Sequence, residues 1–320
     1  MISTTRRGLL GAAALFAVAG YGPVLGQTNY PERGITLIVP YGAGGGTDVT
    51  ARLLARDVEA VLGRPVTVHN LAGGGGWIGW GALAQAQPDG YTLGYLNVPS
   101  MYAGYLDKQY NRKETLDSFT ALMNHVIDYN VWAVAAASPY KGVRDVVEAA
   151  RKDPEKITVT AYGAGSDDHL GILSIQSQAG VKFGVVHHRS TADAKAQALG
   201  GHVHVLGANI SEVAEEVKSG QLRLIGVMSE QRSKFLPDAG TFKEQGFNTV
   251  MSVSRGVAAP AGLPKAVEAK LTEALEKVLS SKEHRERAEQ LALQPEIIKG
   301  DAYKKFLKDN EVATKQLMGW

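Results

Sequence analysis

The segment ITLIVPYGAGGGTD, residues 35–48, decides the fold class. Its first five residues are mostly apolar and β-branched, which predicts a buried β-strand over 35–39. The glycines that follow predict a loop. Thr47 is then the expected N-cap of a helix with an apolar stripe over residues 49–62, which ends near Gly63. A strand, a glycine loop and a helix in this order are typical of a parallel α/β sheet.

The tetrapeptide YGAG of residues 41–44 recurs at residues 162–165. Each copy follows an apolar strand and leads through Thr or Ser and then Asp into a helix. This shared context predicts two similar α/β domains. Ligands of open α/β sheets bind at the carboxyl ends of the strands, so two such edges facing each other predict a ligand-binding cleft.

The rest of the chain repeats the alternation of short β-branched runs with longer amphipathic stretches. The expected strands are 66–70, 91–96, 131–136, 157–161, 182–186, 203–206 and 222–227. The expected helices are 77–87, 143–151, 166–179, a stretch after the break at 260–264, and 303–318.

The N-terminus has the pattern of a secretory signal peptide. Arg6 and Arg7 precede an uncharged, mostly apolar run over 9–20, which is short for a membrane span. Small residues favour cleavage after Gly26, so we expect residues 1–26 to be removed and the rest to be a soluble periplasmic protein. The paired arginines fit a Sec signal and a twin-arginine signal equally well.

Composition excludes several classes of partner. The full chain has 34 basic and 32 acidic residues, and loss of Arg6 and Arg7 with the signal would leave it neutral. A neutral chain has no basic field for nucleic acid or anionic membranes. The chain has no cysteine, so stability must come from packed cores and not from disulfides.

The two glycine loops are candidate anion sites. A helix N-terminus leaves backbone N–H groups unpaired and attracts negative charge, and glycine lets a ligand approach them closely. The alternative is that the glycines only turn the chain, while Asp48, Asp167 and Asp168 satisfy the helix ends. The repeated context favours the anion site.

Two other functions are less favoured. Residues 74–79, GGGWIG, match the dinucleotide pattern G-x-G-x-x-G, but the required acidic residue is missing because Asp89 lies in a Pro-Asp-Gly turn. An NAD-dependent oxidoreductase is therefore the weakest alternative. Five of the eight histidines lie within 169–204, which makes a periplasmic zinc-binding protein the main alternative, although their spacing matches no standard zinc motif.

Several motifs together resemble the Bug-type receptors, the solute-binding proteins of tripartite tricarboxylate transporters. The opening segment 35–48 resembles that family most closely, and the resemblance covers essentially the whole chain after the signal. The other matching motifs are YP at 30–31, GRPV at 63–66, GGGG at 73–76 with Ile78-Gly79, PDGYTL at 88–93 and APAGLP at 259–264.

The resemblance implies a Venus-flytrap fold, α/β with mixed or parallel sheets flanked by helices and two crossover strands between domains. Domain one would comprise residues 27–125 and 250–320, and domain two residues 126–249. It implies a monomeric receptor without a cofactor or enzymatic activity. Such a receptor captures a small organic carboxylate outside the cytoplasm and delivers it to a membrane permease.

The resemblance also implies which residues line the cleft. Arg189 is the expected charged contact, because an arginine can grip a carboxylate in two places. Aromatic side chains at 41, 77 and 162 favour a ring-bearing acid over any other single class, while aliphatic acids remain open. The expected ligand-binding residues are Tyr41, Ala43, Gly44, Thr47, Asp48, Gly75, Gly76, Trp77, Ser100, Tyr162, Gly165, Ser166, Asp168, Arg189 and Asn209.

The chain departs from the family pattern near the inferred cleft. Trp77 replaces a small or polar residue, HHRS at 187–190 replaces a Pro-Tyr segment, and His204 replaces an aspartate. These departures leave the identity of the ligand open.

Overall fold

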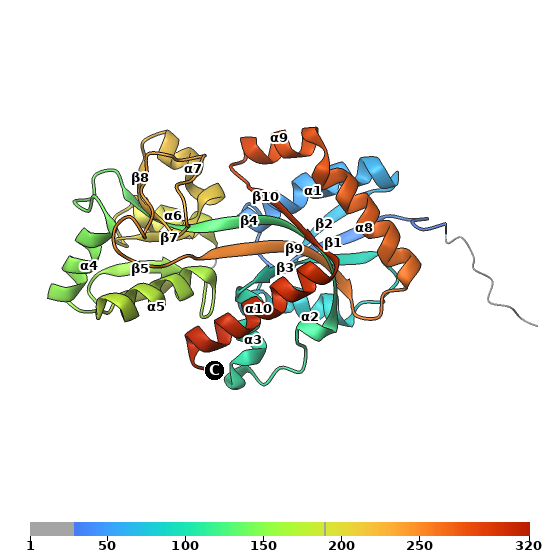
Figure 1. The fold of residues 1–320 in the computed structure, drawn as a ribbon, viewed down its shortest axis with the longest axis horizontal. Helices are drawn as coiled ribbons and strands as arrows, with labels where there is room; N and C mark the ends of the chain where they lie inside the picture. The colour runs from blue at the N-terminus through green and yellow to red at the C-terminus, as the bar shows by residue number, and fades with distance from the viewer. Residues whose placement is uncertain (1–28, 189) are drawn as a thin grey trace, which may run out of the picture.

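A computed structural model describes residues 29–188 and 190–320. The expected signal peptide 1–26 and the candidate ligand contact Arg189 lie outside the described residues. The chain forms two α/β lobes side by side, joined by the long strands β4 (Phe119–Ala135) and β9 (Ser252–Pro260) (Figure 1). The expected two-domain fold with two crossovers is confirmed.

The first lobe contains a mixed sheet with strand order β10-β4-β9-β3-β1-β2. Strands β1 (Ile35–Val39), β2 (Val66–Asn70) and β3 (Thr92–Val98) run parallel, whereas β9 lies antiparallel to β3 and to β4. β10 (Pro295–Lys299) completes the edge beside β4. The three parallel strands therefore bring their carboxyl ends, and the glycine loops after them, to one side of the lobe.

Helices cover both faces of this sheet. One apolar cluster joins the sheet to α1 (Gly46–Leu62) and α8 (Lys265–Ser280). A second joins the opposite face to α2 (Trp77–Gln85), α3 (Ser100–Leu106) and α10 (Gly300–Met318). The helix α9 (Lys282–Gln290) packs beside α1, and short 3₁₀ turns lie at 74–76, 108–110 and 116–118.

The second lobe is built on the far half of β4. There β4 pairs with β7 (Leu206–Asn209) and β8 (Leu222–Val227), and β5 (Thr158–Ala161) pairs with β6 (Gly184–His187). One core packs α4 (Val143–Lys152) and α5 (Asp167–Ala179) against one face. The other core packs α6 (Thr191–Leu199) and α7 (Ile210–Lys218) against the opposite face.

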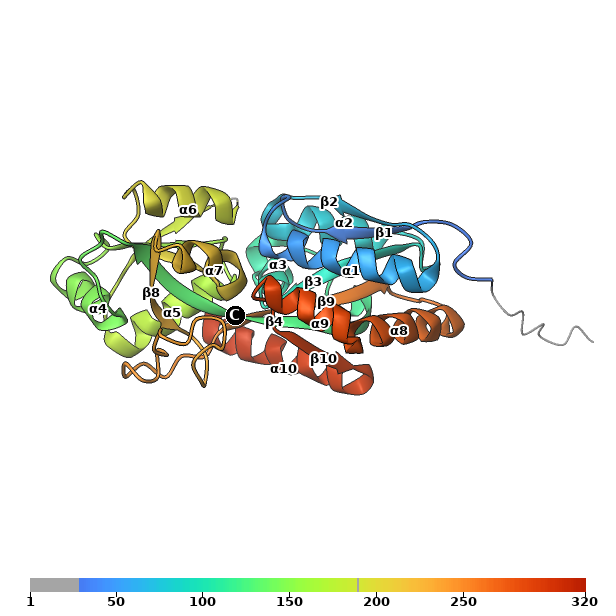
Figure 2. The same ribbon diagram turned by 90° about the horizontal axis from the view of Figure 1, so that it is seen from above.

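The two lobes face each other across their helix N-termini. Seen from above, α1 of the first lobe and α6 and α7 of the second lie on the same side of the long strands (Figure 2). The C-terminal helix α10 packs on β4 and β10 and also reaches α5. No helix among residues 29–188 and 190–320 is long and apolar enough to cross a membrane.

Two local expectations were wrong. The helix after the first glycine loop has Gly45 as its N-cap, and the Thr47 hydroxyl instead accepts a hydrogen bond from the Asn97 amide (2.7 Å). The strand expected at 203–206 lies at β7, three residues later, because the chain bends over 202–204 and makes only an isolated bridge at Val205. His202 and His204 therefore do not share the face of a regular strand.

Candidate functional site

The two YGAG loops meet between the lobes. The rings of Tyr41 and Tyr162 lie edge to face, with centroids 4.9 Å apart. Burial raises the pKa of the Tyr41 hydroxyl well above its usual range and raises the pKa of Tyr162 to about 12. Both phenols therefore stay neutral, and Tyr162 lines two chambers of the cleft.

The first chamber, here called the inner chamber, has a volume of about 60 Å³. Three of its walls carry carboxyl groups, from Asp167, Asp168 and Glu212, and one carries the Arg255 guanidinium. The other walls are supplied by Tyr41, Gly42, Gly45, Gly46, Thr47, Asn97, Ser100, Tyr162, His188, Ser190, Thr191, Asn209 and Val253. This volume has room for a few water molecules.

Helix N-termini from both lobes converge on the inner chamber. The N-cap residues of α1, α5, α6 and α7 are Gly45, Ser166, Ser190 and Asn209, and three of these four line the chamber. Each helix start offers backbone N–H donors and a partial positive charge. The arrangement therefore has the electrostatics of an anion site.

The chain's own side chains accept hydrogen bonds from several of these backbone donors. The N–H of Gly44 donates to Asp48 (2.9 Å), and the N–H of His169 donates to the Ser166 hydroxyl (3.2 Å). Across the cleft, the N–H of Gly46 donates to the carboxylate of Glu212 (3.2 Å). The sequence-based alternative, in which acidic side chains satisfy the helix ends, thus describes part of the site correctly.

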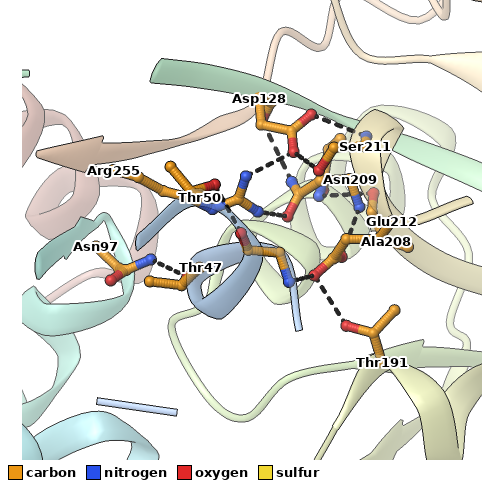
Figure 3. Close-up of polar contacts among 12 residues, drawn as sticks. Thr47, Thr50, Asn97, Asp128, Thr191, Ala208, Asn209, Ser211, Glu212 and Arg255 are labelled. Atoms are coloured by element: carbon orange, nitrogen blue, oxygen red, sulfur yellow. Dashed lines mark hydrogen bonds and ion pairs between the residues drawn. The ribbon is translucent and has the colours of Figure 1, made fainter. Parts of the chain in front are cut away.

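A buried ion pair stands at the base of the inner chamber, where both crossover strands contribute. Arg255 from β9 points toward Asp128 from β4, with Nη1 and Oδ2 2.7 Å apart and both side chains 2% exposed (Figure 3). The other Arg255 amine, Nη2, donates to the Asn209 side-chain oxygen (3.2 Å). The arginine thereby ties the two crossover strands to the start of α7.

Two adjacent aspartates lie beside this pair. The Asn130 amide donates to Asp167 (2.9 Å) and to Asp168 (2.8 Å), and the Asn209 amide also donates to Asp167 (2.7 Å). Burial raises the pKa of Asp167 to about 6, and burial together with the neighbouring Asp167 raises the pKa of Asp168 well above its usual range. Burial and like-charge repulsion together favour a protonated, neutral carboxyl here.

The second chamber, here called the outer chamber, lies on the other side of Tyr162 and has a volume of about 350 Å³. It is lined from the first lobe by Gly74, Gly75, Trp77, Ser100, Ala103, Gly104, Tyr110 and Arg112, and from the second by Tyr162, Gly163, Ala164 and Ser166. Trp77 is 3% exposed, and its indole N–H donates to the Met101 carbonyl (3.1 Å). This volume suits a small organic molecule.

The structure brings most of the expected ligand-binding residues to the two chambers. Tyr41, Thr47, Asp168 and Asn209 line the inner chamber, Gly75, Trp77 and Ser166 line the outer one, and Ser100 and Tyr162 line both.

The remaining candidates lie beside the chambers. Gly44 lines a neighbouring groove, and Ala43, Gly76 and Gly165 lie next to lining residues. Asp48 is 3% exposed and is bound by Arg52, Asn70 and the Gly44 N–H.

Sequence reasoning missed Arg112, Glu212 and Arg255, whereas the strand end at Asn97 was expected beside the cleft. Two of these left a signal. Arg255 is a charged residue within the otherwise uncharged strand 252–260, and a charge buried in a strand requires a partner. Glu212 stands three residues after Asn209, the spacing of a capping box, and its carboxylate does accept the Asn209 N–H (3.1 Å). Nothing in the sequence predicts that Glu212 also contacts Gly46 in the other lobe.

The histidines expected for a zinc site are dispersed. The ring of His169 accepts the Gly165 N–H (3.0 Å), while the ring of His204 contacts the Thr158 hydroxyl (2.8 Å). His187 and His202 are exposed. The part of the chain that the structure describes holds no group of three or more histidine, cysteine or acidic residues arranged to hold a metal ion.

The family model of the tripartite tricarboxylate transporter family receptor matches residues 50–319. The chain is 30% identical over 306 residues to the protein BugT of Bordetella pertussis, covering 94% of this chain and 93% of BugT.

Solved structures give the same result. The periplasmic binding protein BugD is 28% identical with a TM-score of 0.83, over 91% of this chain and 98% of that one. MatC from Rhodopseudomonas palustris, solved with bound malate, shares the fold at 22% identity with a TM-score of 0.82, over 90% of this chain and 99% of that one. With its glycine loops meeting between two lobes of this fold, the chain belongs to the receptor family of the tripartite tricarboxylate transporters.

Proposed function

We propose that this protein is an extracytoplasmic receptor that captures one small organic carboxylate between its lobes and delivers it to a tripartite transporter permease. The observation that carries the proposal is the convergence of helix N-termini from both lobes, at Gly45, Ser166, Ser190 and Asn209, on one cleft. An anion bound there would contact both lobes at once and stabilise the closed form.

The proposal includes a domain division. The domains would comprise residues 27–125 with 250–320, and residues 126–249, and they would open and close by bending in β4 and near the start of β9. It also includes removal of residues 1–26 on export to the periplasm, a monomeric state, and no chemistry on the ligand. Hinge closure around a ligand is a common motion of proteins with two lobes joined by strands.

The ligand class is supported by the chemistry of the chambers. Apolar and aromatic walls at Trp77 and Tyr110 stand beside the outer chamber, and backbone donors stand beside both. The malate-bound relative suggests dicarboxylates as one set of probes, and the aromatic walls suggest benzoate as another.

The test is a thermal-shift screen of malate, adipate, benzoate, nicotinamide cofactors and Zn²⁺. A ligand at a hundred times its dissociation constant adds about 2.7 kcal/mol to the free energy of unfolding. We expect a rise in Tm with at least one carboxylate. A rise with Zn²⁺ alone would support the zinc alternative, and no rise with any acid would overturn the proposal.

A further inference from the structure

We infer that the ligand's carboxylate is bound by Arg112 in the outer chamber, and that Glu212 excludes it from the N-terminus of α1. This inference rests on the proposed function and assigns the two charged contacts that decide where the acid lies. It replaces an anion site shared by the two YGAG loops with one between the glycine turn that follows β2, at Gly74 and Gly75, and the second YGAG loop.

The N-terminus of α1 already holds an anion from the chain itself. One carboxylate oxygen of Glu212 accepts the N–H of Gly46 (3.2 Å) and the Thr191 hydroxyl (2.9 Å). Its other oxygen accepts the N–H of Asn209 (3.1 Å). Glu212 thus occupies in the closed cleft the position that a ligand carboxylate would take, and it joins the two lobes there.

The charges of the inner chamber also oppose a second anion. Three carboxyl groups are among its described lining residues, and the one guanidinium among those residues, Arg255, is already paired with Asp128 at 2.7 Å. The space left is about 60 Å³. An acid placed here would have to displace Glu212 from the N–H groups of Gly46 and Asn209, or lie beside its carboxylate, where like-charge repulsion disfavours it.

The outer chamber has the opposite polarity. Among its described lining residues, Arg112 is the only one that carries a formal charge. Within residues 29–188 and 190–320, Arg112 forms no ion pair, and its buried Nε has no hydrogen-bond partner. A guanidinium without a partner beside a cavity of about 350 Å³ is a ready contact for a carboxylate.

Arg112 is held in place by an aromatic ring. Its guanidinium carbon lies 4.9 Å from the centroid of Trp77, whose indole is anchored to the Met101 carbonyl. Stacking on an aromatic face orients the planar guanidinium and limits its freedom before the ligand arrives. One of its terminal amines also lies near Gly74, 3.7 Å from where a Cβ would stand. Trp77, which departs from the family pattern, therefore helps to position the Arg112 guanidinium.

The test is calorimetric titration of wild type, Arg112→Gln, Arg112→Lys, Glu212→Gln and the exposed neighbour control Lys113→Gln. The probes are malate, adipate and benzoate, each beside its neutral amide. We expect Arg112→Gln to lower the affinity for the acid by about tenfold or more, because a charge-assisted hydrogen bond is lost. The affinity of Arg112→Lys should lie between those of wild type and Arg112→Gln, and the affinity of Lys113→Gln should match that of wild type.

The outcomes separate the two proposals. If wild type binds no acid of the panel, the proposed function fails and this inference fails with it. If wild type binds an acid but Arg112→Gln binds it equally well, only this inference is overturned. An acid bound tenfold more tightly by Glu212→Gln, with Arg112→Gln unchanged, would place the carboxylate at α1 instead. A melting curve of Arg112→Gln close to that of wild type establishes that the variant is folded.

Discussion

Arg255 and Asp128 form an ion pair, 2.7 Å between Nη1 and Oδ2, on the two strands that join the lobes. Each side chain is 2% exposed, so neither charge has water to replace its partner. On the antiparallel ladder Arg255 stands opposite Val126, two residues before Asp128. The pair therefore joins the two crossover strands beside the inner chamber and the start of α7.

Removing one partner of this pair should destabilise the protein strongly. Asp128→Ala leaves the guanidinium buried without a carboxylate, and such a loss costs about 3–5 kcal/mol. We expect a large fall in the urea midpoint for Asp128→Ala. The double variant Asp128→Ala with Arg255→Met should lose less stability than the sum of the losses of the two single variants.

The exposed pair Arg232–Glu244 is the matched control. Glu244→Gln removes a partner of similar geometry in water, where screening makes ion pairs weak, so its urea midpoint should not change measurably. Equal effects of Asp128→Ala and Glu244→Gln would show that burial of the first pair has no energetic weight.

Stability should depend on pH through two buried histidines. Tyr95, His125, His284 and Asp57 form a chain of hydrogen bonds of 2.7, 2.8 and 2.7 Å. Burial lowers the pKa of His125 well below its usual range, and burial also lowers the pKa of His284 despite the nearby Asp57. The folded chain therefore holds both imidazoles neutral.

The direction in which stability changes with pH follows from these lowered pKa values. The unfolded histidines bind protons near the ordinary imidazole pKa of about 6.5 and the folded ones do not, so stability is full above that pH and falls below it. Asp167, with its pKa raised to about 6, acts in the opposite direction. The comparison must therefore be made against a variant that removes one histidine and keeps Asp167.

We expect wild type to lose more stability than His284→Gln between about pH 7.5 and about pH 5.5. The measurement is the urea midpoint of each protein at both values. The exposed His202→Gln should keep the wild-type slope. Parallel slopes for wild type and His284→Gln would contradict the assignment of neutral buried histidines.

The cleft at the carboxyl ends of the strands could be predicted from the repeated YGAG motif. Each copy lies between a strand and a helix, so each must lie at the carboxyl edge of its sheet. The crossover role of β4 could not be predicted, because the sequence predicts a strand only over 131–136, whereas β4 spans 17 residues and its role depends on its pairing partners in both lobes. Glu212 shows the same limit. Its capping role is local and follows from spacing, whereas its bond to Gly46 depends on how the lobes face each other.

The glycine at 165 should control closure of the lobes. A Cβ there would stand 2.4 Å from the Cβ of Ala103 in the other lobe, and its φ of 74° is strained for other residues. We expect Gly165→Ala to weaken ligand binding and to increase the radius of gyration measured by X-ray scattering.

Gly180→Ala is the control for backbone strain. Its φ of 64° is similar, but nothing lies within 4 Å of its Cβ position. It should lower stability by about 1 kcal/mol and leave ligand binding and scattering unchanged. A Gly165→Ala protein with wild-type affinity and scattering would show that this contact does not limit closure.

The expected export signal can be tested on the protein recovered from cells. We predict a mature N-terminus at or near Gln27, found in the periplasmic fraction, by N-terminal sequencing. A protein that keeps Met1 in the cytosolic fraction would contradict the expectation.

Native mass spectrometry of the periplasmic protein tests the central claim most directly. The receptor account predicts one bound small organic acid per chain, retained by wild type and by Gly180→Ala and lost from Gly165→Ala. A chain that carries no acid and binds none when malate, adipate or benzoate is added would contradict the account.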